Sequence, residues 1–249
     1  MIMGNNKNCL VFVTHKLTED ILRYLSFLEK EVDGLMDLLV LYDGAMQPID
    51  IEYYPNLRFY VFDSTNLSGF FHCRCKLLPN PLRALIECAK VYKYDHFLLM
   101  ENDIVFYGNF KSFIHKINSE VNVDYIHIAT DIEGSIEKHW PIKYIQDNPF
   151  EMLYFSWCQL FYISRRLMSE IEEFIKVNDS FYYEFLLPTF AYNKKFFVKQ
   201  FENYGYQFQL SWGPVELYEY KYKYKRAYNT FYHPIKNLSI VDFEDKQII

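Results

Sequence analysis

One stretch decides the fold: His96-Phe97-Leu98-Leu99-Met100-Glu101-Asn102-Asp103, an apolar run that stops abruptly at polar residues. Such a run is typical of a strand buried on both faces, as in a parallel sheet covered by helices. Alternate residues of an extended chain point the same way, so we expect Glu101 and Asp103 to face one ligand. Two carboxylates at a strand end suit Mg²⁺ or Mn²⁺; the alternative is that they only make the strand end soluble.

Similar apolar runs alternate with helical patterns on both sides of this stretch. Thr18 suits the N-cap of a helix, and Pro81 suits the first turn of another. The alternation predicts an α/β fold with a Rossmann-type mixed sheet, mostly parallel, and helices on both faces. We expect strands at residues 10–14, 37–42, 57–62, 96–100, 125–129 and 155–163, and helices at 18–31, 81–92, 110–117 and 165–177.

Composition narrows the class of protein. The chain has 249 residues, 51% of them hydrophobic, with only 8 Gly and 9 Pro, which predicts one globular domain over residues 1–249. The formal charge of −6 argues against nucleic acid as a partner. Residues 9–13 form an apolar run about a quarter of the ~20 residues that a membrane span needs. Five cysteines, three of them in apolar runs, favour a reducing compartment, and hence the cytoplasm.

Ligands of open α/β sheets bind outside the carboxyl ends of the strands. The residues that follow the expected strands include His15, Asp43, Asp63 and Asp131, in addition to the acids at 101 and 103. Several acids at one sheet edge need a cation to hold them together, which again predicts a metal site.

The segment 94–110, YDHFLLMENDIVFYGNF, resembles the signature of nucleotide-sugar-dependent glycosyltransferases with the GT-A fold, of the bacterial surface-polysaccharide type. In that family an Asp-x-Asp motif ends a central strand, and Glu101 here replaces the first Asp. The resemblance implies that Asp103 binds the metal directly and that Glu101 and Asn102 contact the donor. It also implies a GT-A-like fold, with residues 1–105 binding the nucleotide sugar and 106–249 binding the acceptor.

A second match lies near the C-terminus, in Phe231-Tyr232-His233-Pro234-Ile235-Lys236. It is similar to the tail of several bacterial saccharide transferases, which implies that His233 is a metal ligand and that Lys236 meets the diphosphate. An imidazole ligand favours Mn²⁺ over Mg²⁺. The alternatives are a turn residue before proline and an ordinary exposed lysine.

The resemblance also assigns donor contacts in the N-terminal half. It implies that Asp43 contacts the nucleoside, although Asp43-Gly44 is also a routine turn. Arg74 and Lys76 are candidates for the diphosphate, whose negative charge must be neutralised as it leaves. The stretch His72-Cys73-Arg74-Cys75 lacks the four ligands of a structural zinc site.

The acceptor side is expected in the second half of the chain. Glu184 stands in an aromatic and apolar stretch, where a carboxylate is either a paired structural group or a base with a raised pKa. The resemblance implies the second role, with Glu184 deprotonating the acceptor hydroxyl. The aromatic residues of 154–161 suit either stacking on a sugar or the packing of a core strand.

Residues 218–226, YEYKYKYKR, alternate tyrosine with charge. A period of two predicts a strand with tyrosines on one face and lysines on the other. The simpler interpretation is a half-buried edge strand protected by its lysines. The alternative is a docking strip for an anionic lipid headgroup or a lipid-linked acceptor.

Together these features predict a metal-dependent glycosyltransferase that moves a sugar from a nucleotide-diphosphate donor, a UDP-sugar above all, to a saccharide or lipid-linked saccharide. The resemblance implies a role in surface polysaccharide or lipopolysaccharide assembly, in the cytoplasm at the inner face of the membrane. Two alternatives stay open. One is a nucleotidyltransferase, although Thr14-His15-Lys16-Leu17 offers no glycine-rich phosphate loop; the other is a non-catalytic saccharide-binding protein.

Overall fold

The computed structural model describes residues 7–45, 47–66, 81–129, 136–139, 142–143, 145, 148–178, 181–211 and 213–243. These residues form a seven-stranded sheet, a three-stranded sheet and the helices packed on them. The strands are β1 (Asn8–Thr14), β2 (Asp37–Asp43), β3 (Phe59–Phe62), β4 (His96–Glu101), β5 (Val105–Tyr107), β6 (Tyr125–His127), β7 (Leu160–Ser164), β8 (Val198–Gln200), β9 (Gln207–Leu210) and β10 (Thr230–His233). The α-helices are α1 (Glu19–Val32), α2 (Pro81–Val91), α3 (Phe110–Asn118), α4 (Arg165–Ile175), α5 (Tyr183–Asn193) and α6 (Val215–Lys225).

The larger sheet has the strand order β3-β2-β1-β4-β7-β6-β8. Strand β1 lies parallel to β2 and β4, β2 parallel to β3, and β6 parallel to β8. Strand β7 runs antiparallel to both β4 and β6, with Leu160 opposite Met100. The sheet is therefore mixed and mostly parallel, which confirms the predicted fold class. Because β7 is reversed, its first residue lies at the edge where the parallel strands end.

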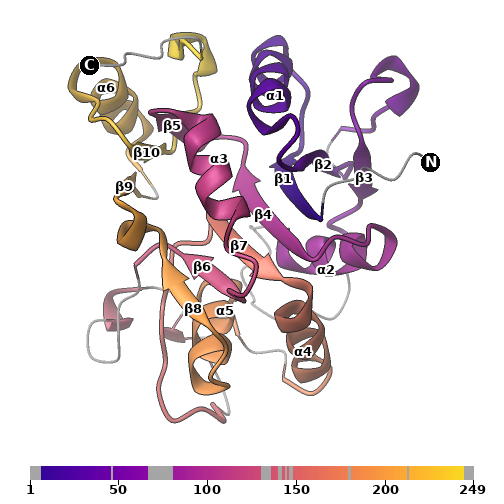
Figure 1. The fold of residues 1–249 in the computed structure, drawn as a ribbon, viewed down its shortest axis with the longest axis vertical. Helices are drawn as coiled ribbons and strands as arrows, with labels where there is room; N and C mark the ends of the chain where they lie inside the picture. Colours follow the sequence, from indigo (N-terminus) through magenta and orange to yellow (C-terminus); the bar gives the residue numbers. More distant parts are fainter. Residues whose placement is uncertain are drawn as a thin grey trace.

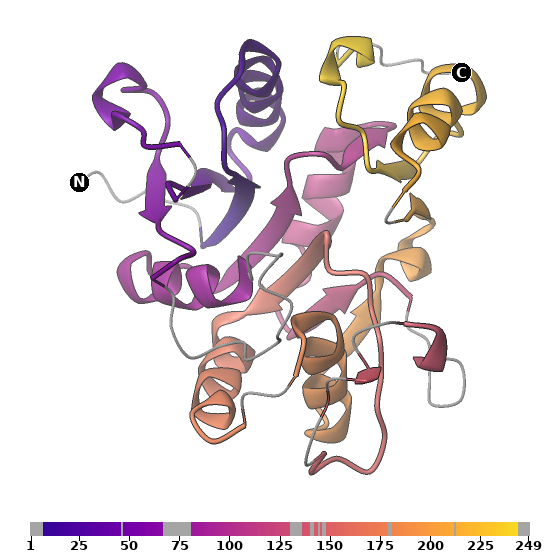
Figure 2. The same ribbon diagram turned by 180° about the vertical axis from the view of Figure 1, so that it is seen from behind.

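Helices cover both faces of the larger sheet (Figure 1 and Figure 2). On one face, α1 and α3 pack over Leu10 and Phe12 of β1. On the other face, α2, α4 and α5 share a core with Cys9 and Val11 of the same strand. Successive side chains of a strand point to opposite faces, so a continuous apolar run supplies both cores.

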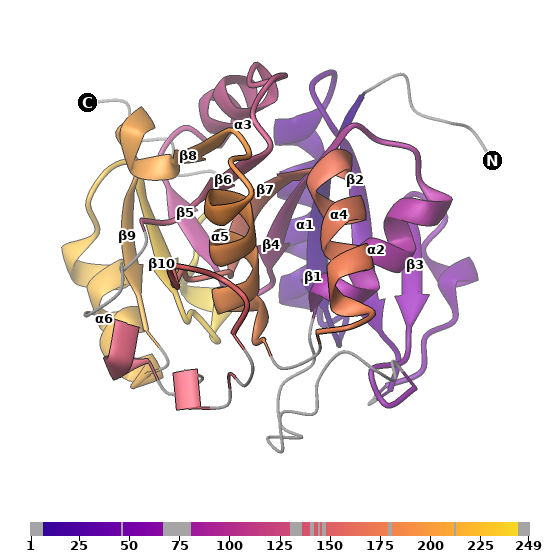
Figure 3. The same cartoon turned by 90° about the horizontal axis from the view of Figure 1, so that it is seen from below.

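The smaller sheet and α6 lie at the side of the molecule opposite β3 (Figure 3). Its order is β5-β10-β9. Strand β10 pairs antiparallel with β5, which places Tyr232 opposite Val105. Beyond the strand, the backbone N–H of Ile235 donates a hydrogen bond of 2.8 Å to the carbonyl oxygen of Asp103. These contacts hold the C-terminal segment against the end of β4.

A cluster of aromatic rings joins the smaller sheet to the larger one. Phe231 of β10 is fully buried. Its ring centroid lies 4.4 Å from that of Phe106, 5.1 Å from Phe113 and 5.2 Å from Phe208. Because Phe113 belongs to α3, these rings connect the smaller sheet to the helix that packs on the larger sheet.

Most of the expected elements are present, with ends that move by at most two residues apart from the start of the strand expected at 155–163. Helix α1 begins after Thr18, whose hydroxyl accepts a hydrogen bond from the N–H of Ile21, as predicted for an N-cap. The strand expected at 155–163 was too long, because regular pairing in the larger sheet begins only at Leu160. Residues 156–159 instead form a loop that borders the site described below.

The strand predicted at 218–226 is wrong, because this segment forms α6. Tyr218 and Tyr222, four residues apart, are buried on one side of the helix, whereas Tyr220 and Tyr224 are exposed. Lysine and glutamate are good helix formers, and lysines in the last turn complement the helix dipole. These local preferences outweigh the period of two.

Among the described residues no helix has the length and apolar content to cross a membrane. Cys9, Cys88 and Cys158 are buried free thiols. The stretch His72-Cys73-Arg74-Cys75, for which the sequence argues against a structural zinc site, lies outside the described part of the chain.

We expect Phe231→Ala to lower the free energy of unfolding by about 3–5 kcal/mol, because it leaves a cavity among packed rings. Urea denaturation followed by circular dichroism would measure the change. The matched control is Val177→Ala, at a residue 83% exposed, where the change should stay within about 0.5 kcal/mol. A loss below about 1 kcal/mol at Phe231 would show that the rings do not join the sheets.

Candidate metal and nucleotide-sugar site

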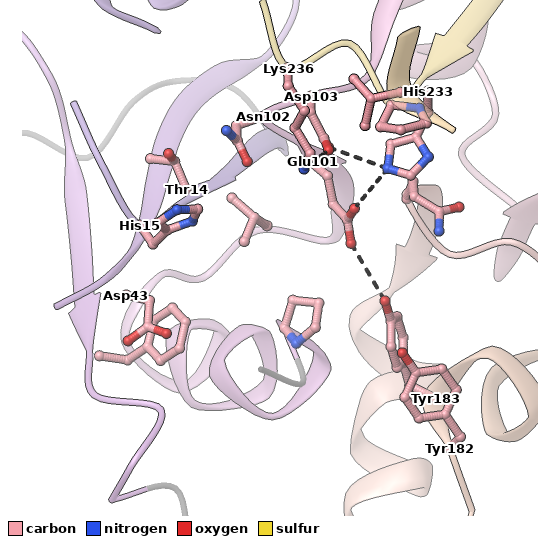
Figure 4. Close-up of a pocket in the computed structure, with 16 residues that line it drawn as sticks. Thr14, His15, Asp43, Glu101, Asn102, Asp103, Tyr182, Tyr183, His233 and Lys236 are labelled. Carbon is pink, nitrogen blue, oxygen red and sulfur yellow. Dashed lines mark hydrogen bonds and ion pairs between the residues drawn. The ribbon is translucent and has the colours of Figure 1, made fainter. Parts of the chain in front are cut away.

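A cavity of about 350 Å³ opens at the carboxyl ends of β1, β2 and β4 (Figure 4). It lies at the edge of the sheet where ligands of open α/β folds bind. Its walls come from strand ends, helix starts and the segment after β10. The lining residues are Val13, Thr14, His15, Asp43, Phe62, Pro81, Glu101, Asn102, Asp103, Gln159, Tyr182, Tyr183, Val215, His233, Pro234 and Lys236.

Two carboxylates and one imidazole converge in this cavity. The Nε2 atom of His233 lies 3.4 Å from Oδ1 of Asp103 and 3.7 Å from Oε2 of Glu101. One ligand atom from each of these residues lies within 4.8 Å of the others, which makes the group a candidate metal site. Figure 4 shows both carboxylates directed at the imidazole. The structure thus brings His233 next to two acids that precede it by at least 130 positions in the sequence.

The charges of this cluster are strongly coupled. Burial, followed by the negative charge of Asp103, raises the pKa of Glu101 to about 7. Burial also disfavours the Asp103 carboxylate, but the hydrogen bond and charge of His233 and the charge of Lys236 hold its pKa well below the usual range. Burial lowers the pKa of His233, but the hydrogen bond and charge of Asp103 outweigh this and raise it. Asp103 is therefore the fixed negative charge of the cluster.

Lys236 supplies a cation at the rim of the cavity. Its Nζ atom forms an ion pair with Oδ2 of Asp103, while more than half of the lysine side chain remains exposed to solvent. Asp103 is thus flanked by the imidazole on Oδ1 and the ammonium on Oδ2. A flexible lysine at a cavity rim can exchange a carboxylate for a bound phosphate oxygen at little steric cost.

Asp43 and His15 form the wall of the cavity at the ends of β1 and β2. The Oδ1 atom of Asp43 accepts hydrogen bonds from the backbone N–H groups of Ala45 (3.0 Å) and Ser64 (3.2 Å). Asp43 therefore stabilises its turn and also borders the cavity, while its contact with a nucleoside stays a prediction. Asp63 instead accepts bonds from its neighbours Thr65 and Asn66 and does not line the cavity.

Tyr182 and Tyr183 form the wall that faces the acids. The hydroxyl of Tyr183 donates to Oε1 of Glu101 at 3.5 Å, at the edge of hydrogen-bonding range. Both residues precede or begin α5, so the helix start presents their rings to the cavity. The sequence shows these tyrosines only as neighbours of Glu184, and nothing in their pattern separates cavity rings from core rings.

Gln159 is a cavity residue that the sequence analysis did not select. It is 2% exposed, and its backbone carbonyl accepts a bond of 3.0 Å from the N–H of Glu101 across the sheet. Its Nε2 donates to Oε1 of Glu184 at 3.4 Å, while its buried Oε1 has no hydrogen-bond partner among the described residues. The available signal was a single polar residue directly before an apolar strand.

Glu184 is fully buried in α5 and does not line the cavity. Burial, followed by the charge of Glu101, raises its pKa well above the usual range. Its carboxyl contacts Gln159, which lines the cavity, and its assignment as a general base stays a prediction. Arg74, Lys76 and Asp131 lie outside the described residues.

No family model matches the sequence, and no curated protein matches it. Solved structures are similar in fold. One shows the galactosyltransferase LgtC in complex with donor and acceptor sugar analogues; it has 14% sequence identity and a TM-score of 0.46, and the match covers 77% of this chain and 72% of that chain. The mannosyltransferase Ktr4p from S. cerevisiae has 11% identity and a TM-score of 0.45, with 81% of this chain and 70% of that chain covered.

A third similar structure is CMP:2-keto-3-deoxy-manno-octonic acid synthetase complexed with CTP, with 8% identity and a TM-score of 0.43; 78% of this chain and 88% of that chain are covered. At these identities the likeness is one of fold.

We expect Glu184→Gln to change how stability depends on pH. A folded-state pKa above the unfolded value of about 4.3 means that the folded protein binds more protons, so the free energy of unfolding falls as pH rises, by at most about 1.4 kcal/mol per pH unit. The variant cannot titrate and should lose this slope, becoming more stable relative to the native protein as pH rises. Urea denaturation at a series of pH values from about 5 to about 8 would measure it.

The matched control is Glu173→Gln, whose side chain is 71% exposed, and it should keep the native slope. Equal slopes for the native protein and the Glu184 variant would mean that Glu184 is already ionised in the fold.

Proposed function

We propose that this chain is a metal-dependent glycosyltransferase that transfers a sugar from a nucleotide-diphosphate donor, with UDP as the expected nucleotide, to a saccharide acceptor. The observation that carries this proposal is the convergence of Glu101, Asp103 and His233 in a cavity that also presents an ammonium and two aromatic rings. A cation site beside a lysine suits a diphosphate, and aromatic rings suit the face of a sugar.

The cluster fits a divalent cation. Asp103 and Glu101 are two acids close enough for one to raise the pKa of the other, and a cation between them would relieve this repulsion. Asp103 and His233 would hold the ion, with Glu101 as a further ligand or as a partner of its water. Oxygen ligands alone suit Mg²⁺, and the imidazole shifts the preference toward Mn²⁺. When bound, the ion supplies positive charge where the departing diphosphate gathers negative charge.

The remaining residues of the cavity are proposed to bind and orient the nucleotide-sugar donor. Lys236 is positioned to exchange Asp103 for a phosphate oxygen, which adds positive charge on the leaving-group side. Asp43 and Asn102 offer oxygens for the ribose and the nucleotide at the ends of β2 and β4. Arg74 and Lys76 stay proposed diphosphate contacts from the sequence alone.

The acceptor is proposed to bind against Tyr182 and Tyr183. Their rings stack or pack against sugar faces, and the Tyr183 hydroxyl keeps the Glu101 carboxylate turned to this wall. Gln159 offers a buried carbonyl oxygen that a sugar hydroxyl can satisfy. We propose a saccharide or lipid-linked saccharide as the acceptor class, as in surface-polysaccharide or lipopolysaccharide assembly at the cytoplasmic face of the membrane.

We expect Asp103→Asn to weaken Mn²⁺-dependent binding of UDP by roughly tenfold or more, because the amide keeps the shape but loses the charge that holds the cation. Isothermal titration calorimetry with UDP, in the presence and absence of Mn²⁺, would measure it. The control Asp33→Asn changes an exposed acid far from the cavity and should bind as the native protein does. Unchanged Mn²⁺-dependent affinity in the Asp103 variant would disprove the metal site.

His233→Ala should weaken Mn²⁺ more than Mg²⁺, because only the transition metal has a preference for imidazole. Titration of UDP with either metal gives the two ratios. His15→Ala removes another histidine of the same cavity and should affect both metals equally. Equal losses for the two metals at His233 would make it a structural residue.

A donor screen scored by product distinguishes the proposal from its rivals. A glycosyltransferase releases a nucleoside diphosphate from a nucleotide sugar, whereas a nucleotidyltransferase releases pyrophosphate from a nucleoside triphosphate and a sugar phosphate. A saccharide-binding protein without activity would bind ligands and release neither. Release of pyrophosphate, or of nothing across UDP-sugars, would reject the proposal.

A further inference from the structure

Helix α6 carries an apolar stripe on its outer side. At about 3.6 residues per turn, Leu217, Tyr220 and Tyr224 lie opposite the side that buries Tyr218 and Tyr222. These three are 43%, 49% and 62% exposed, respectively. The helix therefore has two apolar sides, and only one of them is used by the core. A second apolar side on a surface helix is unusual unless something covers it.

Lysines flank this stripe on both sides. Lys223 lies along one edge and Lys221 and Lys225 along the other, by the same helical spacing. Two of them also contact the exposed rings: the Lys223 ammonium lies 5.2 Å from the Tyr224 centroid, and that of Lys225 lies 5.7 Å from the Tyr220 centroid. The cations therefore stand beside the rings rather than away from them.

The local charge opposes that of the whole protein. The helix and its C-cap carry four basic residues and two acids, in a chain with a net charge of −6. One of the acids, Glu219, accepts a hydrogen bond from the backbone N–H of Asn237, so its carboxylate is bound to the C-terminal segment of the protein. Glu216 is the exposed exception. The charged residues are Glu216, Glu219, Lys221, Lys223, Lys225 and Arg226.

We propose that the outer side of α6 docks on an anionic lipid bilayer, with the helix lying in the plane of the membrane. Exposed aromatic and aliphatic side chains between lysines are the pattern of an interfacial helix, whose rings enter the headgroup region while its cations meet lipid phosphates. The negative charge of the rest of the chain disfavours other orientations on such a surface. Charge complementarity thus selects this face.

Docking also places the cavity near the bilayer. Val215, the first residue of α6, lines the cavity, so the docked helix continues directly into its wall. Figure 1 shows α6 at the opposite end of the molecule from α4 and α5. Delivery of a lipid-linked acceptor into this cavity rests on the proposed function, whereas membrane binding itself does not.

Co-sedimentation with vesicles tests the proposal. The native chain should bind vesicles of equimolar phosphatidylcholine and phosphatidylglycerol, and bind phosphatidylcholine alone much more weakly. Lys221→Gln, Lys223→Gln and Lys225→Gln together should lower binding to the anionic vesicles roughly 100-fold, about fivefold for each charge. Tyr220→Ser with Tyr224→Ser should also lower binding, through loss of the rings rather than of charge.

The matched control replaces three exposed lysines at the α4–α5 end, Lys176, Lys194 and Lys195, by Gln, and should bind as the native chain does. Circular dichroism and urea denaturation show that each variant is folded without the use of a nucleotide, which separates this test from that of the proposed function. Equal losses in the control and α6 triple variants, or no binding by the native chain, would overturn the proposal. So would a native dimer that the tyrosine variant converts to a monomer, because a second copy would then cover the stripe.

Discussion

A backbone hydrogen bond joins the two halves of the candidate site. The N–H of Ile235 donates to the carbonyl of Asp103, directly after β10 has paired with β5. This pairing fixes the position of His233 relative to the end of β4. Without it, a carboxylate near residue 100 and an imidazole near residue 230 would have no reason to meet, because loop closure over such a separation costs entropy that only packing can repay. The aromatic cluster around Phe231 provides that packing.

The charge state of each group in the cavity depends on its neighbours. Asp103 keeps its charge because His233 and Lys236 contact it on either oxygen, and Glu101 is pushed toward the neutral form by the same Asp103. Behind them, burial disfavours a charge on Glu184. The acids thus differ in role although they are alike in chemistry. The difference follows from how deeply each carboxyl is buried and which charged groups contact it.

The local parts of this architecture could be predicted from the sequence. Continuous apolar runs gave β1, β2 and β4, and the acids after β4 marked the site, because both signals depend on neighbouring residues. Features that depend on contacts between residues distant in the sequence could not be predicted in this way. The tyrosine-lysine segment has a period of two that is compatible with a strand, yet it forms α6, and nothing in those residues states which partners are near.

Gln159 was missed for a related reason. A search for polar residues after strands assumes that all strands point to the cavity, but β7 is reversed, so its contribution comes before the strand. The residue opposite Glu101 therefore had to be sought upstream of an apolar run, which the sequence gives no reason to do.

The candidate ligands come from two different sheets, and this has a thermodynamic consequence. A metal ion that engages Glu101, at the end of β4 in the larger sheet, and His233, in β10 of the smaller sheet, would bind the assembled protein and not the separated parts. By mass action its binding energy would then be added to the cohesion between the sheets, in proportion to the logarithm of its free concentration. Occupancy of the cavity and docking of the smaller sheet are therefore linked equilibria, and each would report on the other.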